Sequence, residues 1–360
     1  MTNLGSDMHE VPAIGQTGRS GIVAVGATAF LLAIAEFRLI SFYFLDYIVQ
    51  NVAAAQGVLD GLPHWRVYQS RVLGPLVMAA VSWLGPSLIN AYFITGIGAL
   101  TAAAVVTFRV GQRLEGPAGG WAAMMGLLAL FPLVLSRPWL YIWDFFILVI
   151  GATFLLLVVR RAPWWAFLAL MAVAFLNHES ALFIAIWMAV QGLADNWMRW
   201  RLAWRQWDWR LLGGGVVGGV VGLEVVELLR TLLLNREIGP ELFADASQIG
   251  DHTGGMHIKL LRNLGSVIDW FITFDYSFPF LIPLLLLCAV AVVGVLLAGY
   301  RLKAAGLAVY VAAQVAALCI AAELAETRVL LQLVPFLAVA PLLLNRTRWL
   351  DEEAIKAPAP

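Results

Sequence analysis

The stretch FRLISFYFLDYIVQNV, residues 37–52, closes an apolar run that begins near residue 21 and ends at Asp46. A helix needs about 20 apolar residues to cross a bilayer, and the run from 21 to 45 meets that length. Similar runs recur along the chain, which is 61% hydrophobic and only 13% charged, whereas soluble proteins carry about 25% charged residues. The sequence therefore predicts an all-α, polytopic transmembrane helix bundle. Its net charge of zero gives no case for binding nucleic acid.

Apolar length predicts about 8 to 11 membrane segments, some of them short or broken. Full spans are expected at 21–45, 87–108, 119–135, 138–159, 211–233, 276–300, 302–322 and 328–345, with a short apolar piece at 72–85. The stretch 164–194 is interrupted by NHES at 177–180, which favours a broken helix pair over one long crossing. The expected organisation is a tail (1–20), one multispan domain (21–348) with external segments 46–71 and 234–270, and a second tail (349–360).

The Lys and Arg residues orient these spans. Most of them fall on one side, together with both termini, and the positive-inside rule makes that side cytoplasmic. The assignment holds only if 164–194 returns to the side it left, as a broken pair would. We therefore expect a multi-pass protein of the plasma (inner) membrane with both termini in the cytoplasm.

Two charged residues, Glu36 and Arg38, lie inside the first span. They are two positions apart and point to different sides of the helix, so each needs a partner elsewhere or must snorkel to the membrane surface. We expect an ion pair with another helix. The run GGGVVGGVVG at 213–222 predicts close helix packing, because small residues let membrane helices approach each other.

Under this topology, many polar and charged groups gather toward the outer face. They are Asp46, Asp60, His64, Arg66, Arg71, Arg137, Asp144, His178, Glu179, Glu326 and Arg328. Arg and His could hold a phosphate by charge-assisted hydrogen bonds, and a carboxylate could take a proton from a hydroxyl group. Each group also has a structural reading. Asp46 would be a membrane-surface residue, and Glu326 and Arg328 a helix N-terminus. His178 and Glu179 would belong to a capping-and-packing turn, in which Asn177 caps the second half-helix with Ser180 nearby.

The segment from Asp46 to Leu76 resembles the start of the C-type (GT-C) glycosyltransferases, multispan enzymes that use polyprenyl-phosphate sugars. Asp46 matches the catalytic acidic residue of that superfamily, Gly61 matches a turn, and Arg71 with Pro75 matches an R-x-L-x-P element. The pieces YIWDFF, LNHESALF and ETRVLLQLVPFL are similar to recurring elements of bacterial members. One departure is Tyr47, which stands where many relatives carry a second acidic residue.

The resemblance implies an inverting transfer from a polyprenyl-phosphate sugar to an envelope glycan or lipid acceptor, with Asp46 as general base. The donor phosphate would be held by Arg71, Arg137, Arg328 and His64, and the cavity supported by Asp144, His178, Glu179, Glu326, Arg66 and Asp60. Some relatives use a divalent metal, although no ligand spacing here demands one. Membrane lipids and envelope-assembly proteins are the further expected partners. Two alternatives stay open: a transporter or flippase for lipid-linked substrates, and a non-catalytic envelope-assembly partner.

Overall fold

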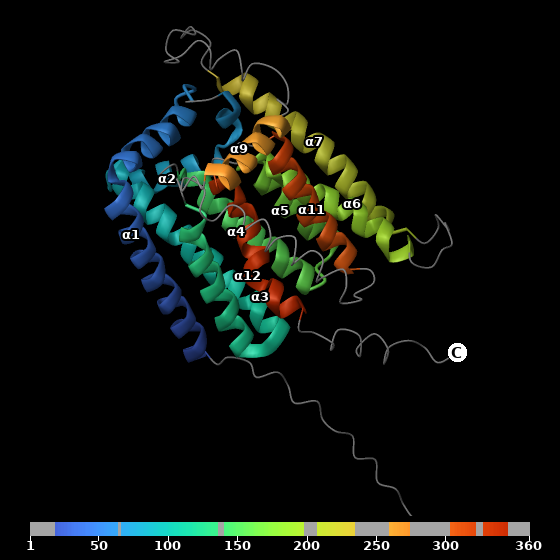
Figure 1. Cartoon of the computed structure of the whole chain (residues 1–360). Coiled ribbons are helices and arrows are strands. Elements are labelled where there is room, and N and C mark those ends of the chain that lie inside the picture. The colour runs from blue at the N-terminus through green and yellow to red at the C-terminus, as the bar shows by residue number, and fades with distance from the viewer. Residues whose placement is uncertain are drawn as a thin grey trace, which may run out of the picture.

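The computed structural model describes residues 19–63, 66–135, 140–197, 207–234, 259–273, 303–321 and 327–344, and within these ranges the chain is helical and contains no strand. The α-helices are α1 (Arg19–Leu59), α2 (Leu73–Trp83), α3 (Leu88–Leu133), α4 (Ile142–Val159), α5 (Trp164–Phe175), α6 (Leu182–Trp197), α7 (Trp209–Leu233), α9 (Leu260–Thr273), α11 (Lys303–Ala321) and α12 (Val334–Leu344). Three short 3-10 helices are η1 (Arg66–Ser70), η2 (Glu179–Ala181) and η5 (Thr327–Leu333). Most α-helices pack side by side as a bundle (Figure 1), which confirms the all-α class.

Four helices in the described ranges are long and apolar enough to cross a membrane. They are residues Gly21–Leu45 of α1, and the whole of α3, α4 and α7. These helices coincide with the predicted spans at 21–45, at 87–108 together with 119–135, at 138–159 and at 211–233. Shorter apolar helices, α11 and α12, occupy the stretches predicted at 302–322 and 328–345. The span predicted at 276–300 lies outside the described residues.

Helix α3 is a hairpin, because its backbone leaves helical geometry at Glu115 and at Gly116, where φ is +72°. Gly111 and Gly119 then lie so close that a Cβ atom on Gly111 would collide with the Gly119 carbonyl oxygen. Two backbones can approach this closely only where side chains are absent. The two halves, 88–114 and 117–133, therefore run antiparallel. They form two helical segments joined by a sharp turn, where spans were predicted at 87–108 and 119–135.

The first half of the NHES stretch, α5, runs alongside α7 in the same direction. Gly214, near the start of α7, faces Trp164 at the start of α5, and Gly222 faces Phe175 at its end. The ring of Phe175 occupies the space that a Cβ atom on Gly222 would need. Glycines on this face of α7 therefore let α5 pack against the α7 backbone.

The second half, α6, meets α7 in the reverse order. Gly215 lies against Ala185 and Ala189, whereas Gly219, further along α7, lies against Leu182 at the start of α6. Since α5 is parallel and α6 antiparallel to α7, the pair forms a hairpin whose two ends lie on the same side of the bundle. The broken helix pair expected at NHES is confirmed.

Helix α1 continues past the first span into the segment predicted to be external. The backbone kinks at Phe44 (φ −133°, ψ 28°), and the helix then runs on to Leu59. Gly61 in the following turn has a φ of +74°, a left-handed conformation that glycine adopts without strain and that stops the helix. The Leu62 N–H closes this turn on the Gly57 carbonyl at 2.7 Å.

The ion pair expected between Glu36 or Arg38 and another helix is absent from the described part of the chain. Arg38 is exposed, and Oε2 of Glu36 is buried without a hydrogen-bond partner there. The next residue, Phe37, packs against Tyr92, Phe93 and Phe145.

Candidate functional site

Two hydrogen bonds to backbone carbonyls fix the tip of the α5–α6 hairpin to its surroundings. The Leu73 N–H at the start of α2 donates to the Leu176 carbonyl at 2.9 Å. Nδ2 of Asn177, which is fully buried, donates to the Trp143 carbonyl at 3.0 Å. The end of the 46–71 segment, the start of α4 and the hairpin tip therefore meet at one place.

Two arginines meet one carboxylate at this tip. Nη2 of Arg71 lies 3.3 Å from Oε2 of Glu179, and Nη2 of Arg230 donates to Oε1 of the same side chain. Only 9% of the Arg71 side chain, 18% of Arg230 and 23% of Glu179 are exposed. A second carboxylate, Glu227, approaches Arg230 at 3.5 Å, but it is 54% exposed on the outer surface of α7. The partly buried Arg71–Glu179–Arg230 cluster therefore contains two positive charges and one negative charge.

Aromatic rings form the wall behind Arg71. Its guanidinium carbon lies 4.6 Å from the centroid of the Tyr68 ring and 5.8 Å from that of Trp143. Tyr141 stacks on Trp143 with the centroids 4.6 Å apart. Aromatic faces attract a guanidinium, so these rings fix its plane against the cluster. Nε of Arg71 is buried and has no hydrogen-bond partner among the described residues.

Glu179 is the first residue of η2, in the turn between α5 and α6. Burial raises the pKa of its carboxyl group, but positive charge on Arg71, then on His178 and then on Arg230 lowers it. The net effect places the pKa of Glu179 below its ordinary value, so the carboxylate is ionised at neutral pH.

His178 caps η2 from within the same turn. Its Nδ1 accepts a hydrogen bond from the Ser180 N–H at 3.0 Å. Nδ1 also lies 3.5 Å from Oε2 of Glu179. Nδ1 of His178 therefore faces both the Ser180 N–H and the Glu179 carboxylate.

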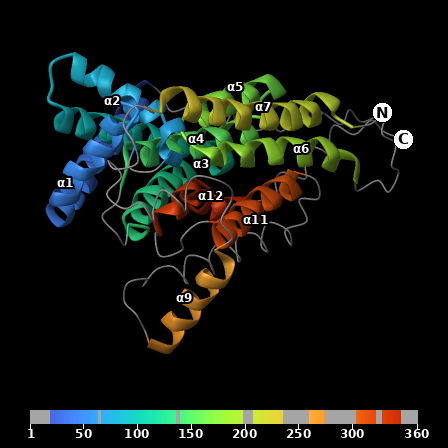
Figure 2. The same ribbon diagram turned by 90° about the horizontal axis from the view of Figure 1, so that it is seen from above.

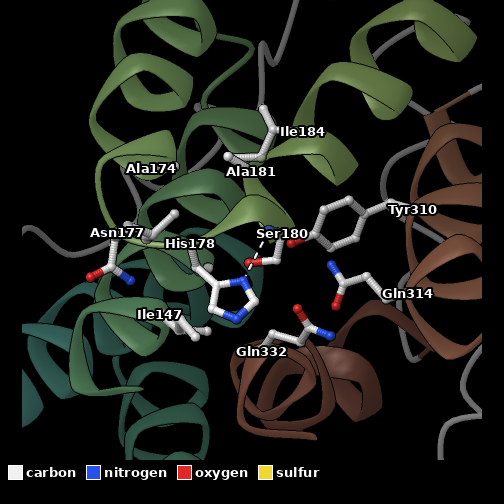
Figure 3. A pocket seen from close by; sticks show the side chains of 12 residues that line it. Ile147, Ala174, Asn177, His178, Ser180, Ala181, Ile184, Tyr310, Gln314 and Gln332 are labelled. Carbon is white, nitrogen blue, oxygen red and sulfur yellow. Dashed lines mark hydrogen bonds between the residues drawn. The ribbon is translucent and has the colours of Figure 1, made fainter. Parts of the chain in front are cut away.

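A small polar cavity lies beside the tip, between η2, α4, α11 and η5. Figure 3 shows His178 and Ser180 directed toward Tyr310, Gln314 and Gln332. The volume in which a water-sized sphere can be centred is about 20 Å³, enough for one water molecule. Oε1 of Gln314 is buried there and has no hydrogen-bond partner in the described part of the protein. The cavity suits an ordered water and is too small for a sugar.

The remaining predicted site residues divide into three groups. Asp60 is exposed at the end of α1, where it accepts from Nε2 of Gln56 at 2.8 Å. Asp144 is buried, and its Oδ2 accepts the Tyr141 N–H at 2.9 Å, which makes it a cap of α4. His64, Arg137 and Glu326 lie outside the described residues, and only the backbone is described for Asp46 in α1, Arg66 in η1 and Arg328 in η5.

Sequence analysis did not select Arg230. The sequence did offer a signal for it: Arg230 lies in the last turn of the span predicted at 211–233, on the same predicted side of the membrane as Arg71. Among the described residues, no three His, Cys, Asp or Glu side chains are grouped so that they could hold a metal ion.

No family model, no curated protein and no solved structure matches this chain.

Proposed function

We propose that this protein is an integral membrane glycosyltransferase. It moves a sugar from a polyprenyl-phosphate donor to an envelope glycan or lipid acceptor at the outer face of the plasma membrane. The observation that carries the proposal is the Arg71–Glu179–Arg230 cluster, in which two guanidinium groups converge on one carboxylate at a membrane face.

The position of the cluster supports a substrate that enters from the membrane surface. Arg230 lies three residues before the end of α7 at Leu233, about one helical turn from its terminus. The cluster is thus near the end of a helix that is long enough to span the bilayer. A lipid phosphate lies at that depth, because the headgroup region flanks the hydrocarbon core.

The chemistry of the cluster suits an oxyanion. Each oxygen of the Glu179 carboxylate faces a different arginine, and a phosphate presents oxygens with a similar spacing. Arginine keeps its charge at any working pH and forms paired hydrogen bonds with phosphate. The buried Nε of Arg71 has no hydrogen-bond partner among the described residues and can donate to such an anion.

In the proposed reaction, Asp46 takes the proton from the acceptor hydroxyl while its oxygen attacks the anomeric carbon of the donor. The bond from that carbon to the phosphate oxygen breaks, and the polyprenyl phosphate leaves with the bonding electrons. Negative charge develops on the leaving phosphate, where Arg71 and Arg230 stabilise it. Asp46 enters through the resemblance of its segment to the GT-C enzymes and because α1 carries it beyond the kink at Phe44.

A carrier for lipid-linked substrates is the second candidate, and the broken α5–α6 hairpin favours it. Transporters place their binding groups at broken helices near the bilayer midplane. The Arg71–Glu179–Arg230 cluster instead lies near one end of α7, which supports the transferase over the carrier.

The test is a transfer assay on protein reconstituted in lipid vesicles with radiolabelled polyprenyl-phosphate sugars and a glycan and lipid extract. We expect the wild type and Glu227→Gln to release label from the donor. Asp46→Asn should abolish release, and Arg71→Leu should lower it through weaker donor binding. Equal release by wild type and Asp46→Asn would remove Asp46 from the mechanism. Movement of intact donor across the bilayer, without release of label, would establish the carrier.

A further inference from the structure

Helix α9 has two chemically distinct faces. Leu261, Leu264, Ile268 and Ile272 repeat at spacings of three and four residues, which places them on one side of the helix. On the opposite side lies a polar row formed by Arg262, Ser266 and Asp269. The helix is therefore amphipathic.

The apolar face of α9 is not covered by the described part of the protein. Leu261 is 82% exposed and Ile272 is 72% exposed, and Leu264 and Ile268 are about half exposed. An isolated helix of 14 residues has only marginal stability in water, and apolar side chains left in water add no stabilisation from burial. The apolar face requires an apolar neighbour.

The start of α9 is fixed firmly to α11. The Lys259 N–H donates to the Ile320 carbonyl at 2.6 Å, and Nδ2 of Asn263 donates to the Cys319 carbonyl at 2.7 Å. These two donors satisfy carbonyls in the last turn of α11, which have no partner within that helix. Asn263 is only 3% exposed, so this hydrogen bond is buried and anchors the start of α9.

The anchor sets the depth of α9 in the membrane. Gln314 lines the cavity beside His178, and Cys319 lies five residues further along α11, about 7.5 Å beyond it. Helix α9 therefore starts at the membrane face where the hairpin tip lies. Figure 2 shows α9 projecting past α11, away from α5 and α7, so residues 259–273 do not lie over the cluster as a lid.

We infer that α9 is an interfacial helix that binds the surface of the lipid bilayer on the side of the hairpin tip. Its Leu and Ile side chains enter the boundary between headgroups and acyl chains, while Arg262 and Asp269 face water. The lipid takes the place of a protein partner and continues the apolar surface of the spanning helices. The inference rests on the membrane-spanning arrangement and is independent of the glycosyl-transfer proposal.

The test places single cysteines on both faces of α9 in full-length protein that carries Cys288→Ala and Cys319→Ala. Leu264→Cys and Ile268→Cys probe the apolar face, and Ser266→Cys and Asp269→Cys probe the polar face. Each variant is labelled with the environment-sensitive dye NBD and reconstituted into phosphatidylethanolamine and phosphatidylglycerol vesicles with doxyl-lipid quenchers.

Two standards calibrate the readout. Val217→Cys lies on the exposed side of α7 within a candidate span, and Asp60→Cys lies in an exposed turn. We expect positions 264 and 268 to shift to the blue and to be quenched by shallow doxyl lipids, as the α7 standard is by deeper ones. Positions 266 and 269 should resemble the Asp60 standard and be quenched by iodide in solution.

Two results would overturn the inference. If all four positions resemble the Asp60 standard, α9 stands in water. If positions 264 and 268 shift to the blue but escape doxyl quenching, protein covers the apolar face instead of lipid. Because all four substituted side chains are at least partly exposed, the variants should fold like the parent, which a thermal melt verifies for each.

Discussion

Replacing Glu179 by Gln removes the charge that holds Arg71 and Arg230 together and changes the volume little. Breaking a buried pair costs about 3–5 kcal/mol, whereas exposed pairs contribute about 0–1 kcal/mol. The three side chains of the cluster are 9–23% exposed, which places them nearer the buried case. We therefore expect Glu179→Gln to lower the free energy of unfolding by about 2–3 kcal/mol. Unfolding in mixed micelles, followed by tryptophan fluorescence, measures this loss.

The matched control is Glu227→Gln, which removes the other carboxylate near Arg230. That side chain is 54% exposed and lies 3.5 Å from the arginine, so its loss should change stability by less than about 0.5 kcal/mol. An added oxyanion should also rescue the Glu179 variant selectively, because it can occupy the place of the missing carboxylate. Phosphate at ten times its dissociation constant would restore about 1.4 kcal/mol. Equal stability of the two variants, or equal effects of phosphate on both, would refute the view that the cluster is an oxyanion site.

Three further substitutions test the packing and the caps. Gly215→Ala should destabilise the protein by about 1–3 kcal/mol, because its Cβ would lie 2.6 Å from the Ala185 carbonyl. Gly213→Ala on the same helix is the control: its Cβ meets nothing within 4 Å, so unfolding in mixed micelles should be unchanged. Asp144→Asn should cost about 1 kcal/mol as a weakened cap of α4 and leave sugar transfer measurable, which would separate it from a catalytic role. Gly61→Ala should cost about 1 kcal/mol, measured as an earlier thermal melt, because its φ is +74°.

The spans and their breaks could be predicted because the signals are local. Apolar length located α1, α4 and α7, and the Asn-His-Glu-Ser sequence marked the turn between α5 and α6. Glycine spacing predicted close packing of α7, and the structure identifies α5 and α6 as the helices it contacts. Each of these features depends on residues within one continuous segment of the chain.

The charged cluster could not be predicted in full because its members are far apart in the chain. Arg71 and Glu179 are separated by 108 positions, and Arg230 and Glu179 by 51. Which groups meet depends on how the hairpin packs against α7, and no local pattern encodes that packing. The NHES turn is capped, but by His178 and not by Asn177 as predicted, because Asn177 donates to the Trp143 carbonyl instead. The oxygens of Glu179 face arginines.

Asp144 is a residue whose role its position in the sequence does not determine. Sequence analysis placed this carboxylate, just inside a predicted span, among the residues that support the cavity of the site. In the structure its Oδ2 instead accepts the N–H of Tyr141, a bond that lies entirely within the first turn of α4. Sequence position alone does not separate a helix cap from a functional acid, because both favour the first turn of a helix.

The sharp turn at Gly116 also constrains how the chain enters the bilayer during synthesis. Only two residues separate the halves of α3, and Gly111 touches Gly119 immediately beside the turn. Neither half can therefore move into the membrane far ahead of the other once the turn has formed. The pair should integrate as a single insertion unit, and a reporter inserted between residues 114 and 117 should block integration, whereas one in the exposed loop at Arg161 should be tolerated.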